Sequence, residues 1–285
     1  MATRDAGGSS SNGGSDVTVT GVRPNRLTSW LRDRLAHPLA RGLDLDSPEA
    51  TAVHARLIRE KPFLRRLYLQ YYREYDAAVR RAAPGGLVLE IGSGAGFYRD
   101  LHAGVRSLDL RPGADVDVAG SALALPFRDR TASAILMLNV LHHLPDPRAF
   151  FRECSRVLKT GGRVCLIEPY VSPLSRRLTK PLHHEPWDEH GGWSLPSSGP
   201  MTGANMALPS IVFVRDRATY DAEFPELPVD RLRPHTIALY LLSGGVSMRS
   251  LVPAALFSPL LAVEQWLEAS GRSLASMMTI ELVRR

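Results

Sequence analysis

The chain has 285 residues, of which 44% are hydrophobic and 22% are charged, and this composition excludes a disordered chain, a collagen-like rod and a disulfide-stapled miniprotein. The length is that of one α/β domain with insertions. The net charge of +6 comes almost entirely from arginine, since only Lys61, Lys159 and Lys180 are lysine, and the arginines are scattered. Scattered charge argues against a nucleic-acid-binding surface, so we expect no nucleic-acid partner.

Residues 1–23 contain the run GGSSSNGGS and almost no apolar side chains. Such a segment cannot offset the entropy of ordering, so we expect a disordered tail. It also lacks the apolar core of a secretory signal. The two cysteines, Cys154 and Cys165, fit a reducing compartment, and together these features predict a cytoplasmic protein.

Residues 24–83 are predicted to form an N-terminal helical cover. Apolar residues at helical spacing indicate a first helix over 27–35. Ser47, followed by Pro and Glu, opens a second helix, and a third is expected from Phe63 to Ala82, separated from the second by Pro62.

From Gly86 onwards, short apolar runs alternate with amphipathic segments, which is typical of strand–helix units and a mostly parallel sheet. We therefore expect one α/β domain over residues 84–285. Residues 170–226 show no clear period over much of their length and are predicted to be a lid insertion before the last two strands. The expected strands are Leu87–Ile91, Val105–Asp109, Val116–Val118, Ala132–Leu138, Arg163–Glu168, Val229–Ile237 and Met277–Val283.

The segment 237–263 contains a single charged residue, Arg249. Two glycines at 244 and 245, Pro253 and Pro259 interrupt it, so no apolar run reaches the ~20 residues that a bilayer crossing requires. We predict a buried helix or an apolar wall around a lipophilic ligand and no transmembrane segment. Attachment to a membrane surface stays open as an alternative.

The run Val88–Gly96 reads VLEIGSGAG, a hydrophobic strand that leads into three glycines at alternate positions. Glycines in such a turn allow a ligand to approach the backbone closely. The dinucleotide fingerprint G-x-G-x-x-G would require a third glycine at Phe97. The turn therefore favours a cofactor other than a nicotinamide or a flavin.

With Glu90 ahead of the glycines and Asp109 at the end of the next strand, the sequence resembles the class I S-adenosylmethionine-dependent methyltransferases. The segments ALPF at 124–127, NVLHHL at 139–144 and RVLKTGG at 156–162 resemble further marks of the subgroup that methylates small molecules. The resemblance covers about residues 80–169. It implies a Rossmann-like, seven-stranded, mostly parallel sheet flanked by helices, with S-adenosylmethionine as cofactor.

The resemblance also implies a cofactor site. Asp109 would take the ribose hydroxyls in bidentate fashion. Ser121 stands near the position where the family often has an Asp for the adenine amino group, and because a hydroxyl accepts less strongly than a carboxylate, we expect adenine recognition to depend more on nearby backbone groups. The predicted cofactor residues are Tyr72, Glu90, Gly92, Ser93, Gly94, Gly96, Asp109, Leu110, Ser121, Ala122, Leu123, Asn139 and Val140.

Methyl transfer from a sulfonium needs a base only when the acceptor must lose a proton. His142 and His143 follow the predicted strand 132–138 and so lie at the carboxyl edge of the sheet, where open α/β sheets bind ligands. We predict His143, with His142 second, as the base. The alternative is that both histidines cap the start of the next helix. Glu168, at the end of another strand, is a further candidate base or an ordinary strand-end carboxylate.

The run 183–190 reads HHEPWDEH and offers His184 and Glu185 as further catalytic candidates, brought over the acceptor by the lid. Its spacing matches neither a helical zinc pair nor a cysteine–histidine site, and Pro186 prevents a regular helix. We therefore predict no metal site.

These features predict a methyltransferase that acts on a hydroxyl, carboxylate or nucleophilic carbon of a small, lipophilic metabolite, as in secondary metabolism. Rings from 63–72, with Trp187 and Trp193, and the apolar stretch 239–261 indicate a pocket for such an acceptor. The alternatives are an RNA or protein methyltransferase and a non-catalytic cofactor-binding scaffold protein. We expect a monomer or a homodimer.

Overall fold

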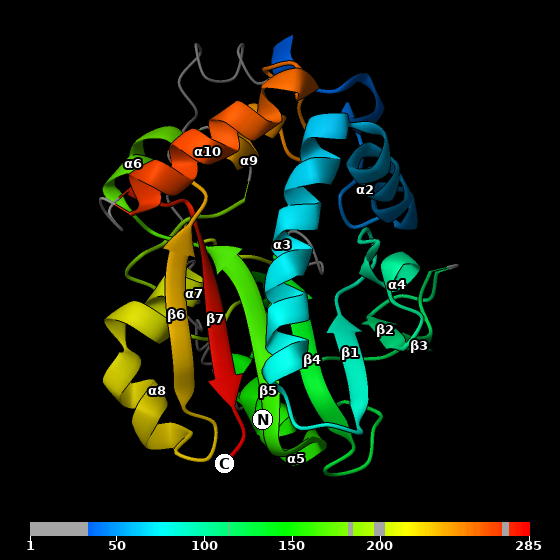
Figure 1. Cartoon of the computed structure of the whole chain (residues 1–285), viewed down its shortest axis with the longest axis vertical. Coiled ribbons are helices and arrows are strands. Elements are labelled where there is room, and N and C mark those ends of the chain that lie inside the picture. Colours follow the sequence, from blue (N-terminus) through cyan, green and yellow to red (C-terminus); the bar gives the residue numbers. More distant parts are fainter. Residues whose placement is uncertain (1–33, 114, 182–184, 197–202, 270–273) are drawn as a thin grey trace, which may run out of the picture.

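The computed structural model describes residues 34–113, 115–181, 185–196, 203–269 and 274–285, and its centre is one seven-stranded sheet in the order β3-β2-β1-β4-β5-β7-β6 (Figure 1). Neighbouring strands from β3 to β5 pair in parallel, whereas β7 pairs antiparallel with both β5 and β6. This topology confirms the predicted fold class. The strands are β1 (Leu87–Ile91), β2 (Val105–Asp109), β3 (Val118–Ala119), β4 (Ala132–Leu138), β5 (Leu158–Pro169), β6 (Val229–His235) and β7 (Met277–Val283).

Helical segments connect and cover these strands. They are η1 (Pro38–Ala40), α2 (Pro48–Glu60), α3 (Pro62–Arg81), α4 (Tyr98–Leu101), η2 (Leu141–His143), α5 (Pro147–Val157), α6 (Pro173–Leu178), α7 (Leu208–Ser210), η3 (Ile211–Arg215), α8 (Arg217–Glu223), α9 (Leu239–Ser243), η4 (Ala254–Leu256) and α10 (Phe257–Glu268).

Local sequence explains where the first long helices start. The Ser47 hydroxyl accepts a hydrogen bond from the backbone N–H of Ala50 and caps α2, with Pro48 in the first turn. Pro62 lacks an N–H and therefore cannot continue the hydrogen bonding of α2. It is the first residue of α3. The helices expected at these positions are therefore present. The predicted helix over 27–35 and the predicted tail 1–23 lie mostly or wholly outside the described residues.

Two hydrophobic cores lie on opposite faces of the sheet. Alternate residues of β4 point to each face: Ile135 packs with the side chains of α5, and Leu136 packs with those of α3. Helix α3 crosses the sheet over β4 and β5 (Figure 1). Cys154 and Cys165 are both buried and free, one in each core.

The insertion between β5 and β6 differs from the predicted lid. Phe213, Tyr220 and Phe224 are buried and surround Phe151 of α5 with ring centroids 5.2 to 5.7 Å away, so residues 203–227 complete the core on that face. Their helices are too short to show a helical period, which explains the difference. Apart from this segment, the division of the chain into a cover, a domain and a lid stays a prediction.

Other differences are small. Strand β5 begins at Leu158 rather than Arg163, because Leu158 already pairs with Ala132, and the polar residues 159–162 bulge out of the ladder with Gly161 at a positive φ of 78°. The described residues between β2 and β3 form turns without a helix, as their shortness suggests. None of the helices in the described ranges has both the length and the apolar character that a bilayer crossing requires.

Candidate cofactor and acceptor site

A cavity of about 510 Å³ opens at the carboxyl ends of β1, β2, β4 and β5. Every residue predicted to bind the cofactor lines it, as do three of the predicted catalytic residues. His184, the fourth, lies outside the described residues. The fold therefore brings the cofactor and catalytic candidates, which come from separate segments, to one site.

The glycine turn after β1 leaves its backbone open to the cavity. Gly92 has a φ of 69°, and its N–H donates to the Leu108 carbonyl at 2.8 Å. A Cβ at this position would lie 2.4 Å from Cγ2 of Val140, so both the conformation and the space require glycine. A Cβ at Gly96 would lie 3.1 Å from the Ser93 carbonyl oxygen. This cradle without side chains fits a ligand that presses against the backbone.

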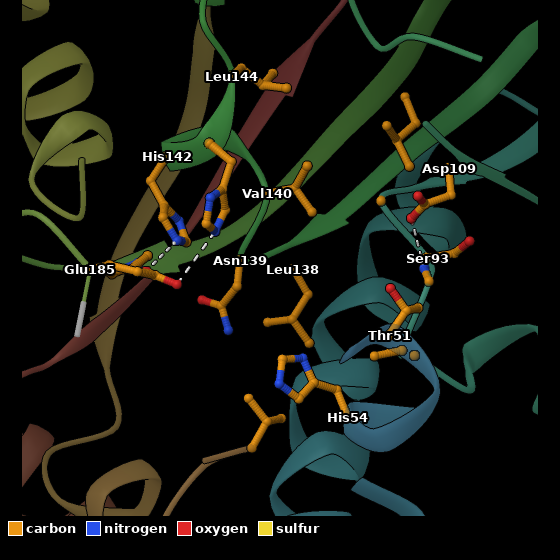
Figure 2. Close-up of a pocket in the computed structure, with 18 of the residues that line it drawn as sticks. Thr51, His54, Ser93, Asp109, Leu138, Asn139, Val140, His142, Leu144 and Glu185 are labelled. Carbon is orange, nitrogen blue, oxygen red and sulfur yellow. Dashed lines mark hydrogen bonds and ion pairs between the residues drawn. The ribbon is translucent and has the colours of Figure 1, made fainter. Parts of the chain in front are cut away.

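Asp109 ends β2 with its carboxylate at this turn (Figure 2). Its Oδ2 accepts a hydrogen bond from the N–H of Gly94 at 3.0 Å, and its Oδ1 accepts from the N–H of Arg111 at 3.2 Å. These two bonds fix the carboxylate at the cavity wall and leave acceptor capacity on each oxygen. A fixed carboxylate beside a glycine turn is what a ribose diol requires, so the residues fit an adenosyl group.

Ser121 and Tyr72, both predicted to contact the cofactor, also form hydrogen bonds within the protein. The Ser121 hydroxyl accepts from the N–H of Leu123 at 3.1 Å and stabilises the turn that holds Ala122. The Tyr72 hydroxyl accepts from the N–H of Phe97 at 2.9 Å. Both residues line the cavity, but these hydroxyls also shape its backbone. Their roles toward the cofactor stay predictions.

Glu90 is buried beneath the glycine turn, and desolvation, with the charge of Asp100, raises its pKa from 4.5 to about 8. The native state therefore holds a proton that the unfolded state releases. Between about pH 4.5 and pH 8, this group should lower the free energy of unfolding by about 1.4 kcal/mol per pH unit.

Glu90→Gln removes this titration, so we expect the variant to lose less stability than wild type between pH 5 and pH 8. Urea unfolding of both proteins at the two pH values measures the difference. Equal pH dependence in wild type and variant would show that Glu90 is ionised in the native state.

At the other end of the cavity, His142, His143 and Glu185 form a polar cluster, which we call the His–Glu cluster (Figure 2). His142 Nε2 lies 3.3 Å from Glu185 Oε2, and His143 Nε2 lies 3.7 Å from Glu185 Oε1. The ligand atoms of all three lie within 4.8 Å of one another. The predicted absence of a metal considered spacing within 183–190 alone, whereas this cluster joins two distant segments.

Glu168 contacts the His–Glu cluster through His142 and fixes the orientation of that ring. One of its carboxylate oxygens accepts from the N–H groups of Val140 and Leu141 at 2.8 and 2.7 Å, and the other lies 2.7 Å from His142 Nδ1. Glu168 is fully buried, and its carboxylate holds the loop after β4 and the His142 ring, which an ordinary strand-end carboxylate does not do. Burial lowers the pKa of His142, but the attraction and hydrogen bonds of Glu168 and Glu185 outweigh it and raise the pKa to about 10.

The alternative prediction, that His142 and His143 cap the start of the next helix, is wrong. Asp146 is the residue that caps α5, because its carboxylate accepts from the N–H of Ala149 at 3.0 Å. His142 and His143 instead form the short turn η2, with His142 buried and its carbonyl accepting from the N–H of Asn205.

Several residues that line the cavity were not predicted from the sequence. Thr51 and His54 reach the cavity from α2 (Figure 2). Tyr240 does so from α9. No motif marks these positions, since a helix face or a loop far along the chain supplies each of them. Among the rings predicted for the pocket, Tyr68, Tyr72 and Trp187 line the cavity, whereas Phe63, Tyr71 and Trp193 belong to the two cores.

Comparisons with known proteins agree with this geometry. Residues 89–166 match the family described as a methyltransferase domain. A probable tRNA methyltransferase 9B of Mus musculus is 27% identical over 49% of this chain and 34% of its own length. An uncharacterized methyltransferase of Mycobacterium leprae is 33% identical over 29% of this chain and 36% of its own.

A ubiquinone biosynthesis O-methyltransferase of Xanthomonas campestris pv. campestris is 28% identical over 38% of this chain and 58% of its own length. The matches thus span between about a third and three fifths of these relatives. Among solved structures, a geranyl diphosphate C-methyltransferase from Streptomyces coelicolor A3(2) is 16% identical, with a TM-score of 0.46, over 87% of this chain and 88% of that one. The chain carries a class I S-adenosylmethionine-dependent methyltransferase domain, and its cofactor is S-adenosylmethionine.

Proposed function

We propose that the protein transfers the methyl group of S-adenosylmethionine to a hydroxyl, carboxylate or nucleophilic carbon of a small, lipophilic metabolite. The observation that carries this proposal is that one cavity joins the glycine turn and Asp109 to an apolar wall that ends in the His–Glu cluster. When bound, the cofactor supplies a methyl group on a positively charged sulfur, which is an activated leaving group.

The apolar wall supports a small acceptor. Apolar side chains from α2, α3, β4, the region of α9 and the start of β7 line the cavity; they are Ile58, Tyr68, Leu138, Tyr240, Leu241, Val246, Met248 and Met277. Such a wall binds an aliphatic or aromatic body and excludes water from the transfer. It offers few groups for the phosphates of an RNA, which supports the small-molecule reading over the RNA alternative.

The His–Glu cluster supplies the polar end of the acceptor pocket. His142 is held between Glu168 and Glu185, so its ring is fixed, and His143 Nε2 lies beside the same Glu185 carboxylate. This arrangement places nitrogen and oxygen atoms where a hydroxyl or carboxyl group of the acceptor would be oriented and activated. His143 and Glu185 are the residues that we propose to act on that group.

We expect His143→Ala to lower kcat by about 100-fold or more, the usual contribution of an activating group in contact with the reacting atoms. Affinity for S-adenosylhomocysteine should stay near that of wild type, because the glycine turn and Asp109 are unchanged. His190→Ala, an exposed histidine of the same segment as Glu185, is the matched control and should keep wild-type turnover. Full activity of His143→Ala would remove this role.

The proposed activity is tested by S-adenosylhomocysteine release with a panel of small lipophilic hydroxyl, carboxyl and enol compounds, after calorimetry has confirmed cofactor binding. Turnover with members of this panel is expected. Cofactor binding without release for any acceptor class, RNA and protein included, would support the non-catalytic alternative instead.

A further inference from the structure

We propose that His142, His143 and Glu185 bind a divalent transition-metal ion such as Zn²⁺, with its remaining coordination positions open to the cavity. The site rests on the geometry of the His–Glu cluster alone. Its role in catalysis deepens the proposed function and depends on it: the ion would bind the oxygen of the acceptor.

The distances in the cluster suit a shared ion. Zn²⁺ binds imidazole nitrogen and carboxylate oxygen at about 2.1 Å, so two ligand atoms of a tetrahedral ion lie about 3.4 Å apart. Glu185 Oε2 lies 3.3 Å from His142 Nε2, and Glu185 Oε1 lies 3.7 Å from His143 Nε2. Since all three ligand atoms lie within 4.8 Å of one another, side-chain rotations that shorten the longest separation by about 1.4 Å bring them into one coordination sphere.

The surroundings of His142 are those of a metal ligand. A ligating histidine usually donates its second ring nitrogen to a carboxylate, which fixes the ring and its tautomer. Glu168 lies 2.7 Å from His142 Nδ1, and its other oxygen is fixed by the N–H groups of Val140 and Leu141. The ring is therefore held with Nε2 pointing toward Glu185.

The charge and the ligand number also favour a cation. Two carboxylates, Glu168 and Glu185, face His142 in a region where each side chain is at most 9% exposed. A divalent ion on the cluster would replace the proton that the two carboxylates hold on His142 and would offset their charges in its place. Two imidazoles and one carboxylate select first-row transition ions over Mg²⁺ or Ca²⁺. Three protein ligands with an open position are typical of catalytic rather than structural sites.

An ion at this place would bear on the choice of acceptor. All three ligands line the cavity that we propose to hold the acceptor. A hydroxyl or carboxyl oxygen that coordinates the ion loses its proton more readily and is held toward the cofactor. The inference therefore favours an oxygen acceptor over a carbon nucleophile. In this state His143 Nε2 binds the metal, and the proton of the acceptor passes to the carboxylate oxygen of Glu185 that does not bind the ion.

The test uses the full chain, freed of metal with a chelator and saturated with S-adenosylhomocysteine. Calorimetric titration with Zn²⁺ is expected to give one site per chain. Titration with Co²⁺ is expected to give visible d–d bands without thiolate charge-transfer bands, because Cys154 and Cys165 are buried in the cores away from the cluster. Absence of stoichiometric binding of both ions would overturn the proposal.

Variants identify the ligands. Glu185→Gln and His143→Gln should each weaken Zn²⁺ binding by about 100-fold or more, and Glu168→Gln by about 10- to 100-fold through the ring that it orients. His190→Gln is the matched control and should bind as wild type does. Affinity for S-adenosylhomocysteine verifies that each variant is folded. Wild-type Zn²⁺ affinity in both Glu185→Gln and His143→Gln would contradict the assignment.

Activity separates this inference from the proposed function. Metal-free enzyme should regain methyl transfer to an oxygen acceptor when Zn²⁺ or Co²⁺ is added, and the chelator should abolish it. Full turnover by metal-free enzyme would overturn the catalytic role of the ion and leave the methyltransferase proposal standing. Stoichiometric, ligand-dependent metal binding without turnover on any acceptor would support the site and contradict the proposed function.

Discussion

Gly94→Asp is expected to reduce the affinity for S-adenosylmethionine and S-adenosylhomocysteine by at least about 100-fold, which corresponds to about 3 kcal/mol of binding free energy. A Cβ at this position would lie 2.9 Å from Oδ2 of Asp109 and 3.0 Å from Cγ2 of Thr51. The new carboxylate would stand beside that of Asp109 and repel it. It would also fill the space that the ribose requires. Isothermal titration calorimetry measures the loss.

Gly104→Asp is the matched control, because a Cβ at Gly104 meets nothing within 4 Å and this residue lies outside the cavity. It carries the same change of charge and should bind the cofactor as wild type does. Cofactor affinity of folded Gly94→Asp equal to that of Gly104→Asp would mean that the adenosyl group lies elsewhere.

Glu168→Ala is expected to lower the free energy of unfolding by at least about 3 kcal/mol. The change leaves the buried N–H group of Leu141, the partly buried N–H group of Val140 and the His142 ring without their acceptor. Since Glu168 is fully buried, water cannot replace the lost bonds without rearrangement of the core. Urea unfolding followed by circular dichroism measures the difference.

Glu60→Ala removes a carboxylate that forms an exposed pair with Arg56 at 2.8 Å, and it should change stability by less than about 1 kcal/mol. A loss for Glu168→Ala as small as that for Glu60→Ala would show that the carboxylate does not hold the loop after β4.

Much of the sheet was predictable because strands such as β4 and β7 are buried on both faces and therefore read as short apolar runs between glycines and polar turns. Leu87–Ile91 and Ala132–Leu138 have the bounds that the sequence predicts. The start of β5 was not predictable, since a polar bulge around Gly161 separates Leu158 from the apolar part of the strand. The burial of Phe213 and Tyr220 in the insertion before β6 was not predictable, because aromatic packing rather than periodicity orders these residues.

The two halves of the site differ in how well the sequence reveals them. The cofactor half is local: the glycine turn follows β1 directly, and Asp109 ends the neighbouring strand, so a short motif specifies both. The acceptor half is assembled over long distances. Glu185 meets His142 only through the fold, and neither Thr51 nor Tyr240 belongs to a recognisable pattern. Hence the metal-ligand geometry of the His–Glu cluster was visible in the structure alone.

A crystal structure of the protein with S-adenosylhomocysteine tests the position of the cofactor most directly. We expect the ribose hydroxyls to contact the carboxylate of Asp109, the adenosyl group to lie across Gly92–Gly96, and the sulfur to face the His–Glu cluster. A ligand bound away from the glycine turn, or a ribose without contact to Asp109, would contradict the account.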